Sequence, residues 1–480
     1  MSSPSTTKNR VADKQSMMDK YLAWFTRWMP ESFVICLALT VFVGLFALIA
    51  TEAPFWSMDA ETTSVVSAWA DGFWSLLAFT MQMTVLLATG SAVASSPPAQ
   101  RMLTRIARIP NNRVQAILLG SISAALLGYL HWGLGMMAAI VLGKEILAQS
   151  RRKGYDLHPP VMIAALFMAF LPSSAGISGA AVLYSATPNY LRDMVPDEYK
   201  ERVPESVGLT DTVLRWDFIL LLVICSVVTI TFAMLMHPKE KDKIESISDE
   251  FLAEIEEGAD GVEVPRNTPA EKANASRWIM YFIGGIGLLY SVFNLVANGV
   301  TGLNLDSFNF LFLSLGMVLT ANYGPEYYGK LIRDGIQGTW GFILQFPFYA
   351  GIFGMISLTG LGVVISGFFT SISTATTWPV IAFIYSGILN IAVPSGGSKF
   401  VIEAPYIIPT TVDLGADMGL VLQAYQMGDG VTNLLIPFFA LPYLANFKIK
   451  FSSVVGYTVP PVLVVFVLTC IYMYIRASMG

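Results

Sequence analysis

The stretch Pro394-Ser395-Gly396-Gly397-Ser398 interrupts a long apolar run, residues 378–411, and decides how this chain can fold. A matching stretch, His131-Trp132-Gly133-Leu134-Gly135, interrupts the run 114–148. Because a membrane crossing needs roughly 20 apolar residues, each run is too long for one crossing and each half is too short to cross alone. We therefore predict that both runs form re-entrant hairpins, which enter and leave the membrane on the same side.

The rest of the chain has the composition of a polytopic membrane protein. Of its 480 residues, 54% are hydrophobic and 13% are charged, whereas a soluble domain carries about 25% charged residues. The mean hydropathy is +0.59. This composition excludes a soluble enzyme, and the net charge of −5 predicts no nucleic-acid partner. Cys36, Cys225 and Cys470 lie apart in apolar runs, which indicates neither disulfides nor a zinc site.

Basic residues predict the orientation, because cytoplasmic loops collect Lys and Arg. If the N-terminus is cytoplasmic and both hairpins are re-entrant, most of the 29 basic residues fall on the cytoplasmic side. Residues 1–32 lack the small-residue cleavage site of a secretory signal, so we expect them to stay in the cytoplasm.

The two halves of the chain resemble each other. Asp71-Gly72-Phe73-Trp74 matches Gln337-Gly338-Thr339-Trp340, and the hairpin breaks recur at nearly the same spacing. We predict a cytoplasmic segment (1–32), a first repeat (33–236), a cytoplasmic linker (237–276), a connecting helix (277–297) and a second, inverted repeat (298–480). An all-α fold with inverted repeats and broken helices is typical of secondary transporters, which bind substrate near the bilayer midplane.

The hairpin tips are the predicted binding site for a small carboxylate. The helix after each break presents unpaired N–H groups and the positive end of its dipole. Glycines there let a ligand approach the backbone, and serines can cap the helix, although the glycines could serve only close helix packing. Further breaks are expected at 171–176 and at 428–430. The predicted substrate-binding residues are His131, Trp132, Gly133, Gly135, Ser173, Ser174, Gln345, Ser395, Gly396, Gly397, Ser398, Lys399 and Asn433.

Charged and polar residues within the apolar runs are functional candidates, because charge is costly in a bilayer. Gln426, Asp429 and Asn433 share one face of a predicted helix, which either lines the site or bonds to neighbouring helices. Lys399 and Glu403 are four residues apart and are placed to pair, either structurally or as a substrate-binding cation and a proton-exchanging carboxylate. The predicted ion-coupling residues are Glu403 and Asp429. A lone histidine such as His131 is more often structural than functional.

Several strings occur in a characteristic order: Trp69-Ala70-Asp71-Gly72-Phe73-Trp74, Gln345-Phe346-Pro347-Phe348-Tyr349-Ala350-Gly351 and Val393-Pro394-Ser395-Gly396-Gly397, followed by Leu414-Gly415-Ala416-Asp417. In these strings the sequence resembles the bacterial short-chain fatty acid transporter family. The similarity runs from about Trp28 to the C-terminus and is weakest over 190–275. The resemblance implies the fold of the ion-transporter superfamily, elevator-like alternating access, and substrates such as acetoacetate and butyrate.

The sequence departs from the family pattern at the predicted site. After Ser395-Gly396-Gly397 the family pattern continues with glycine, then histidine or glutamine, then tryptophan, whereas this chain has Ser398-Lys399-Phe400. Glu403 stands where glutamine is usual, and His131 where asparagine is usual. Pro172-Ser173-Ser174 replaces a glycine run. These changes predict a different carboxylate or a different coupling ion.

We therefore expect a secondary active symporter of small carboxylates, most simply short-chain fatty acids or related monocarboxylates, driven by H⁺ or Na⁺ and using no metal or other cofactor. A dicarboxylate symporter and an anion channel are the alternatives; the spans contain no motif of a membrane-embedded enzyme. We expect a multi-pass protein of the bacterial cytoplasmic (inner) membrane whose partners are the carboxylate and the lipid bilayer. Assembly as a homodimer is an open alternative.

Overall fold

The computed structural model describes residues 30–59, 61–240, 266–337 and 339–479, together with Arg27, Ile244, Phe251 and Ile255, and for Phe342 only the backbone. Most of the predicted linker 237–276 and of the predicted N-terminal segment 1–32 lies outside the described residues. The described residues form helices and no strand. Among them, seven helices are long and apolar enough to cross a membrane, or up to nine if each of two bent pairs counts as one span. This confirms an all-α polytopic fold.

The first half of the chain contains the first predicted hairpin. Its helices are α2 (Ser32–Ala50), α3 (Val65–Gly72), α4 (Leu77–Ala94), α5 (Pro97–Ala107), α6 (Arg113–Leu130), α7 (Trp132–Lys153), α8 (Pro159–Met168), α9 (Phe170–Ser174), α10 (Ala180–Ala186), α11 (Tyr190–Asp193), α12 (Asp197–Lys200) and α13 (Trp216–Met236).

The second half follows a short helix and a connecting helix. Its helices are α15 (Pro269–Asn274), α16 (Arg277–Asn298), α17 (Leu305–Thr320), α18 (Pro325–Gln337), α19 (Trp340–Leu358), α20 (Leu361–Ile372), α21 (Trp378–Ala392), α22 (Gly396–Asp413), α23 (Met418–Asn433), α24 (Pro437–Phe447) and α25 (Phe451–Ser478).

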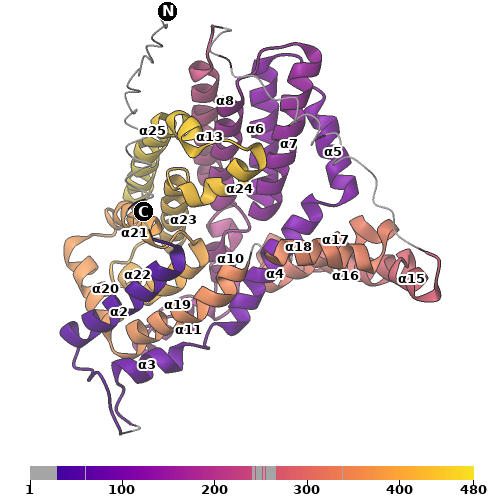
Figure 1. Ribbon diagram of the computed structural model, residues 1–480. Coiled ribbons are helices and arrows are strands. Elements are labelled where there is room, and N and C mark those ends of the chain that lie inside the picture. The colour runs from indigo at the N-terminus through magenta and orange to yellow at the C-terminus, as the bar shows by residue number, and fades with distance from the viewer. Residues whose placement is uncertain are drawn as a thin grey trace, which may run out of the picture.

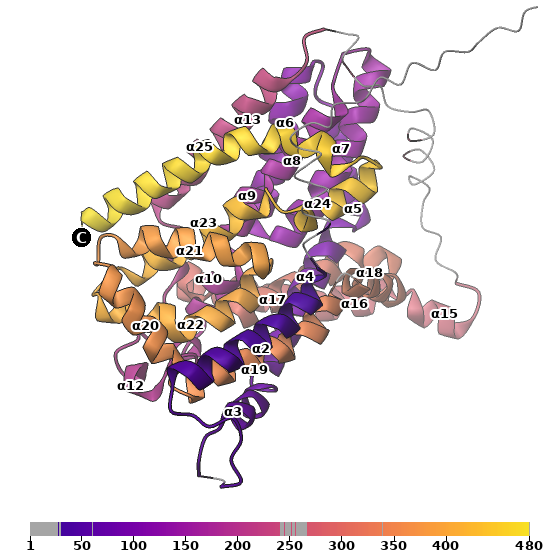
Figure 2. The ribbon, with the colours of Figure 1, turned by 60° about the vertical axis from the view of Figure 1, so that its left-hand side comes forward.

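The order of elements in α2–α13 returns in α17–α25. In each half a long helix and a shorter one (α4 and α5, α19 and α20) precede a hairpin (α6–α7, α21–α22), and a broken helix and a terminal helix follow it. In Figure 1 the hairpin α6–α7 stands at one end of the molecule and α20–α22 lie toward the other, with α16–α18 along one flank. Figure 2 shows α25 as a long rod alongside α13, and α2 beside α19. The repeated order supports the predicted duplication, while the path of each hairpin through the membrane stays a prediction. The expectation that each half of a hairpin is too short to cross alone is wrong for α6, whose 18 residues are long and apolar enough to span a membrane.

Two local features differ from the sequence-based expectations. Helix α20 was not among the predicted apolar runs; it follows α19 at an angle of 73° after Gly360, whose φ of +80° favours glycine. The expected break at Gly428-Asp429-Gly430 is wrong, because α23 continues to Asn433 and the chain breaks between Asn433 and Pro437. Gly428 instead lets α23 approach α21, since a Cβ there would lie 2.5 Å from the carbonyl oxygen of Phe383. The other expected break is present between α9 and α10.

Candidate functional site

A cavity of about 370 Å³ lies where the tip of the second hairpin meets the two broken helices. Its walls come from both repeats: α2, α4, α7 and the α9–α10 segment belong to the first, and α19, α22, α23 and α24 belong to the second. A volume of this size suits a small organic ligand. The predicted residues that line it are Trp132, Ser173, Ser174, Gln345, Ser395, Gly396, Gly397, Ser398, Asp429 and Asn433.

The start of α22 forms one polar end of this cavity. Pro394 cannot extend the preceding helix, and Ser395 caps α22 by accepting the N–H of Ser398 through its hydroxyl oxygen. The N–H groups of Gly396 and Gly397, the first two in the helix, have no acceptor among the described residues. A Cβ at Gly397 would lie 3.2 Å from Phe79 Cζ, so the cavity wall leaves little room for a larger side chain. This end of the cavity can donate hydrogen bonds to an anion.

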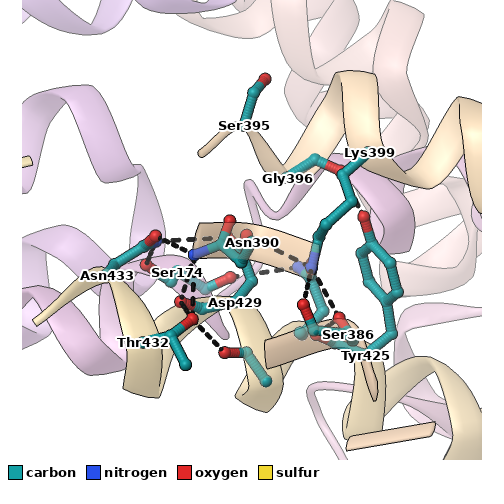
Figure 3. A network of polar contacts seen from close by, with 12 residues as sticks. Ser174, Ser386, Asn390, Ser395, Gly396, Lys399, Tyr425, Asp429, Thr432 and Asn433 are labelled. Atoms are coloured by element: carbon teal, nitrogen blue, oxygen red, sulfur yellow. Dashed lines mark hydrogen bonds and ion pairs between the residues drawn. The ribbon is translucent and has the colours of Figure 1, made fainter. Parts of the chain in front are cut away.

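The polar face of α23 forms the adjoining wall. Gln426, Asp429 and Asn433 all line the cavity, as the helical spacing predicts. Gln426 donates to the carbonyl oxygen of Ser174 at 3.1 Å, and Asn433 lies 3.4 Å from the Ser174 hydroxyl. Asn390 of α21 donates to Asn433 at 2.6 Å (Figure 3). The two interpretations of this polar face, as a wall of the cavity and as a set of bonds to neighbouring helices, are therefore both correct, because the same side chains do both.

Lys399 lies behind this wall rather than in the cavity, and it does not form the expected pair with Glu403. Its ammonium donates to the carbonyl oxygen and the hydroxyl of Ser386 at 3.0 and 2.6 Å. It lies 3.6 Å from Asp429 Oδ1 and 4.3 Å from the ring centre of Tyr425 (Figure 3). The partner of Lys399 is thus Asp429 on a different helix, because the side chain points from α22 toward α21 and α23.

Glu403 is fully buried one turn after Lys399. Neither of its carboxylate oxygens has a hydrogen-bond partner among the described residues. The hydroxyl of Tyr425, which interacts with Glu403 electrostatically, donates to the carbonyl oxygen of Gly396 at 2.8 Å. Lys399 and Asp429 also act on Glu403 through their charges. The three ionisable residues therefore form one buried group next to the cavity.

The first hairpin contributes less to the cavity than expected, because His131, Gly133 and Gly135 do not line it. Nδ1 of His131 accepts the N–H of Gly133 at 3.1 Å, and the ring packs against Phe312 with centroids 4.3 Å apart. A Cβ at Gly135 would collide with the backbone of Gly128, so this glycine permits the close approach of α6 and α7. The structure thus places His131 as a buried helix cap and Gly135 in helix packing.

Several lining residues were not predicted. Gln426 was recognised in the polar stripe but not counted as a site residue, and Tyr349 lies one helical turn after Gln345, to which its hydroxyl donates at 3.3 Å. Gln345 in turn donates to the hydroxyl of Ser32 at 2.8 Å. The apolar part of the wall is formed by Met83, Leu87, Met136, Phe170, Trp340, Phe346, Phe438, Phe439 and Leu441. Aromatic residues carry no sequence signal that separates a cavity wall from a packed core.

No basic side chain lines the cavity among the described residues. Within the same part of the chain, no group of three or more His, Cys, Asp or Glu side chains is placed to hold a metal ion.

Comparison with known proteins places this architecture in a family. The family model for short chain fatty acid transporters matches residues 15–476. The proposed short-chain fatty acid transporter of Escherichia coli (strain K12) is 31% identical over 439 residues, which cover 91% of this chain and 94% of that protein. The corresponding protein of Haemophilus influenzae (strain ATCC 51907 / DSM 11121 / KW20 / Rd) is 28% identical over 452 residues, covering 92% and 95%.

Two solved structures share the fold. The Alcanivorax borkumensis YdaH transporter, described as having an unusual topology, aligns with a TM-score of 0.59 and 14% identity over 94% of this chain and 99% of its own. Neisseria gonorrhoeae MtrF, from a class of antimetabolite efflux pumps, aligns with a TM-score of 0.53 and 15% identity over 95% and 97%. From the family match and these relatives, this chain is a member of the short-chain fatty acid transporter family.

Proposed function

We propose that this protein is a secondary active symporter of short-chain monocarboxylates, driven by an inward H⁺ or Na⁺ gradient. The observation that carries this proposal is the division of the cavity wall. Its polar end offers the free N–H groups of Gly396 and Gly397 together with the amides of Gln426 and Asn433. Most of the remaining wall is aromatic and aliphatic, and the polar side chains of Ser32, Gln345 and Tyr349 within it are bonded to one another. A carboxylate with a short alkyl chain matches both parts.

The cavity also favours one acid group over two. A second carboxylate is held best by a basic side chain, and the described lining residues contain no Lys, Arg or His. Among the other donors in the lining, Ser32, Gln345 and Tyr349 are already bonded to one another. Asp429 adds a carboxylate to the wall, and its contact with Lys399 offsets the repulsion that a substrate anion would otherwise meet. The proposal therefore ranks monocarboxylates above dicarboxylates as substrates.

We also propose a transport cycle and a location for the protein. The two helical repeats support alternating access with the substrate carried between them, and the apolar helices support a multi-pass position in the bacterial cytoplasmic membrane. A cytoplasmic N-terminus and a homodimer stay predictions.

Uptake into proteoliposomes tests this function. Purified protein is given radiolabelled acetate, butyrate, acetoacetate or succinate, and protein-free liposomes correct for the neutral acids that cross lipid unaided. A symporter accumulates the monocarboxylates against their gradient and saturates. Flux that rises linearly with concentration and never exceeds equilibration would show a channel, and preference for succinate would overturn the monocarboxylate assignment.

Two glutamines on α23 provide a matched pair of variants. Gln426 lines the cavity, whereas Gln423 is buried one turn earlier and donates to the carbonyl oxygen of Thr212 at 2.7 Å. Gln426→Leu should weaken apparent substrate affinity about 2- to 10-fold, the worth of one lost hydrogen bond. Gln423→Leu should lower thermal stability and leave affinity unchanged. If both variants changed the substrate affinity equally, the assignment of this cavity as the binding site would be wrong.

A further inference from the structure

The ammonium of Lys399 occupies a position lined by oxygen atoms. The side chain is 0% exposed, and the ammonium contacts the carbonyl and hydroxyl oxygens of Ser386 and a carboxylate oxygen of Asp429. Carbonyl, hydroxyl and carboxylate oxygens are the ligands that hard metal cations take in proteins. The positive charge that neutralises Asp429 is therefore part of the chain and is held on α22.

Glu403 adds a second carboxylate to the same group. The ammonium of Lys399 is paired with Asp429, so an ionised Glu403 would remain fully buried without a cation of its own. A buried charge without a partner is strongly unfavourable. The conformation seen here therefore favours a proton on Glu403.

A route joins Glu403 to the cavity. The hydroxyl of Tyr425 interacts with Glu403 and bonds to the carbonyl oxygen of Gly396, a residue that lines the cavity. Tyr425 thus lies between the buried carboxyl and the space that water and substrate reach.

From this geometry we infer that transport is coupled to protons and not to sodium, with Lys399 replacing a bound metal cation at Asp429 and Glu403 carrying the coupling proton. This inference rests on the proposed symport function. In each cycle one carboxylate oxygen of Glu403 takes a proton from water on one side of the membrane and returns it to water on the other, so no other bond changes.

The groups that face Glu403 come from its own helix and the helices packed on α22. Helix α20 carries no titratable side chain. Tyr184 of α10 interacts electrostatically with Tyr190, and Tyr349 of α19 interacts with Cys36, so neither of these tyrosines has Glu403 as its partner. The titratable groups that act on Glu403 are Lys399 and Tyr406 of α22, Tyr385 of α21, and Tyr425 and Asp429 of α23. The only cation in this set is Lys399, so the proton on Glu403 completes the neutralisation.

Gradient-driven uptake distinguishes the two coupling ions. Proteoliposomes are assayed with radiolabelled acetoacetate, an acid polar enough to cross lipid slowly, and protein-free liposomes are subtracted. A pH difference of one unit should drive accumulation of about tenfold in NaCl and in KCl alike. A sodium gradient without a pH difference should drive none. Accumulation by the sodium gradient overturns this inference alone, whereas no accumulation of any carboxylate under either gradient overturns the proposed function.

Glu403→Gln tests the proton carrier, because the amide has the size of the acid and cannot exchange a proton. Exchange of acetoacetate at equal pH should persist, while accumulation in the pH gradient should fall to equilibration. Asp59→Asn, in an exposed loop, is the control and should behave as the wild type. Persistence of pH-driven accumulation in Glu403→Gln would overturn the role of Glu403.

Infrared spectroscopy gives a readout that needs no substrate. The wild type at neutral pH should show the carbonyl band of a protonated carboxyl group, and Glu403→Gln should lose it. A wild type without this band would contradict a proton on Glu403.

The role of Lys399 has its own test. Lys399→Ala removes the tethered ammonium, so its thermal stability should be higher in NaCl than in choline chloride, while the wild type should be equally stable in both. A wild type that is stabilised specifically by sodium would overturn the cation-replacement role, even if the variant cannot be purified.

Discussion

The contact between Lys399 and Asp429 makes a quantitative prediction about coupling across two helices. At 3.6 Å and an effective dielectric constant of about 20, opposite unit charges attract by roughly 5 kcal/mol. Removing one partner of a buried ion pair costs about 3–5 kcal/mol, because the other charge is left without compensation. Lys399→Met and Asp429→Asn should therefore each lower the free energy of unfolding by this amount, and the double variant should lose far less than their sum.

The coupling is measured with a double-mutant cycle in detergent micelles. Cys36 and Cys225 are buried, so their reaction with a thiol reagent reports unfolding without any added probe. We expect a coupling free energy of about 3 kcal/mol or more between Lys399 and Asp429. The matched control is the pair that the sequence suggested, Lys399 and Glu403, which should be coupled by less than about 1 kcal/mol if Glu403 is protonated. Additive losses for Lys399→Met and Asp429→Asn, within about 0.5 kcal/mol, would refute the reasoning.

Three other predictions address the hairpins and the edge of the membrane domain. Gly397→Leu should abolish uptake, because Gly397 lines the cavity, and should lower the melting temperature less than Gly135→Leu, because a side chain at Gly135 collides with the backbone of Gly128 whereas one at Gly397 meets the tip of the Phe79 ring. The reverse order in melting assays, or normal uptake by Gly397→Leu, would contradict these roles. Cysteines introduced at Gln100 and Arg151 should react only with cytoplasmic reagent, and cysteines at Ala375 and Val412 only with external reagent; labelling of either pair from opposite sides would disprove re-entrant hairpins. Burial, with a smaller effect of His237, lowers the pKa of His158 from 6.5 to about 4. Between pH 4 and 6.5 the unfolded state therefore binds more protons than the folded state, so the stability should fall as the pH drops through this range. His158→Gln should make the melting temperature less dependent on pH.

The sequence predicted those parts of the fold that depend on local signals. Proline followed by Ser-Gly-Gly favours a helix break at 394–397, and α22 begins there, with Ser395 as its cap and Gly396 and Gly397 in its first turn. The face shared by Gln426, Asp429 and Asn433 follows from helical periodicity, and it holds in the structure because α23 is regular over these residues. Helix α20 was missed because its 12 residues are too few for a crossing.

What the sequence could not predict depends on contacts between helices. Spacing along α22 suggested Glu403 as the partner of Lys399, but the side chain turns toward Asp429 and Ser386 on other helices. Gly428 and Gly430 looked like a break, yet glycine is tolerated within a helix when a neighbouring backbone comes close, as α21 does here. The packing of the buried His131 against Phe308 and Phe312 of α17 likewise could not be predicted from its position at a hairpin tip.

The capped starts of α7 and α22 show how the duplicated halves have diverged. Four residues after its cap His131, α7 has Gly135, and eight residues after it has Ala139; at the same distances from Ser395, α22 has Lys399 and Glu403. One half therefore fills these positions with the smallest side chains and gains a tightly packed hairpin, while the other fills them with a cation and an acid. Because these two ionisable side chains stand in one half only, the hairpins are not interchangeable, and the internal symmetry of the fold does not extend to its charge.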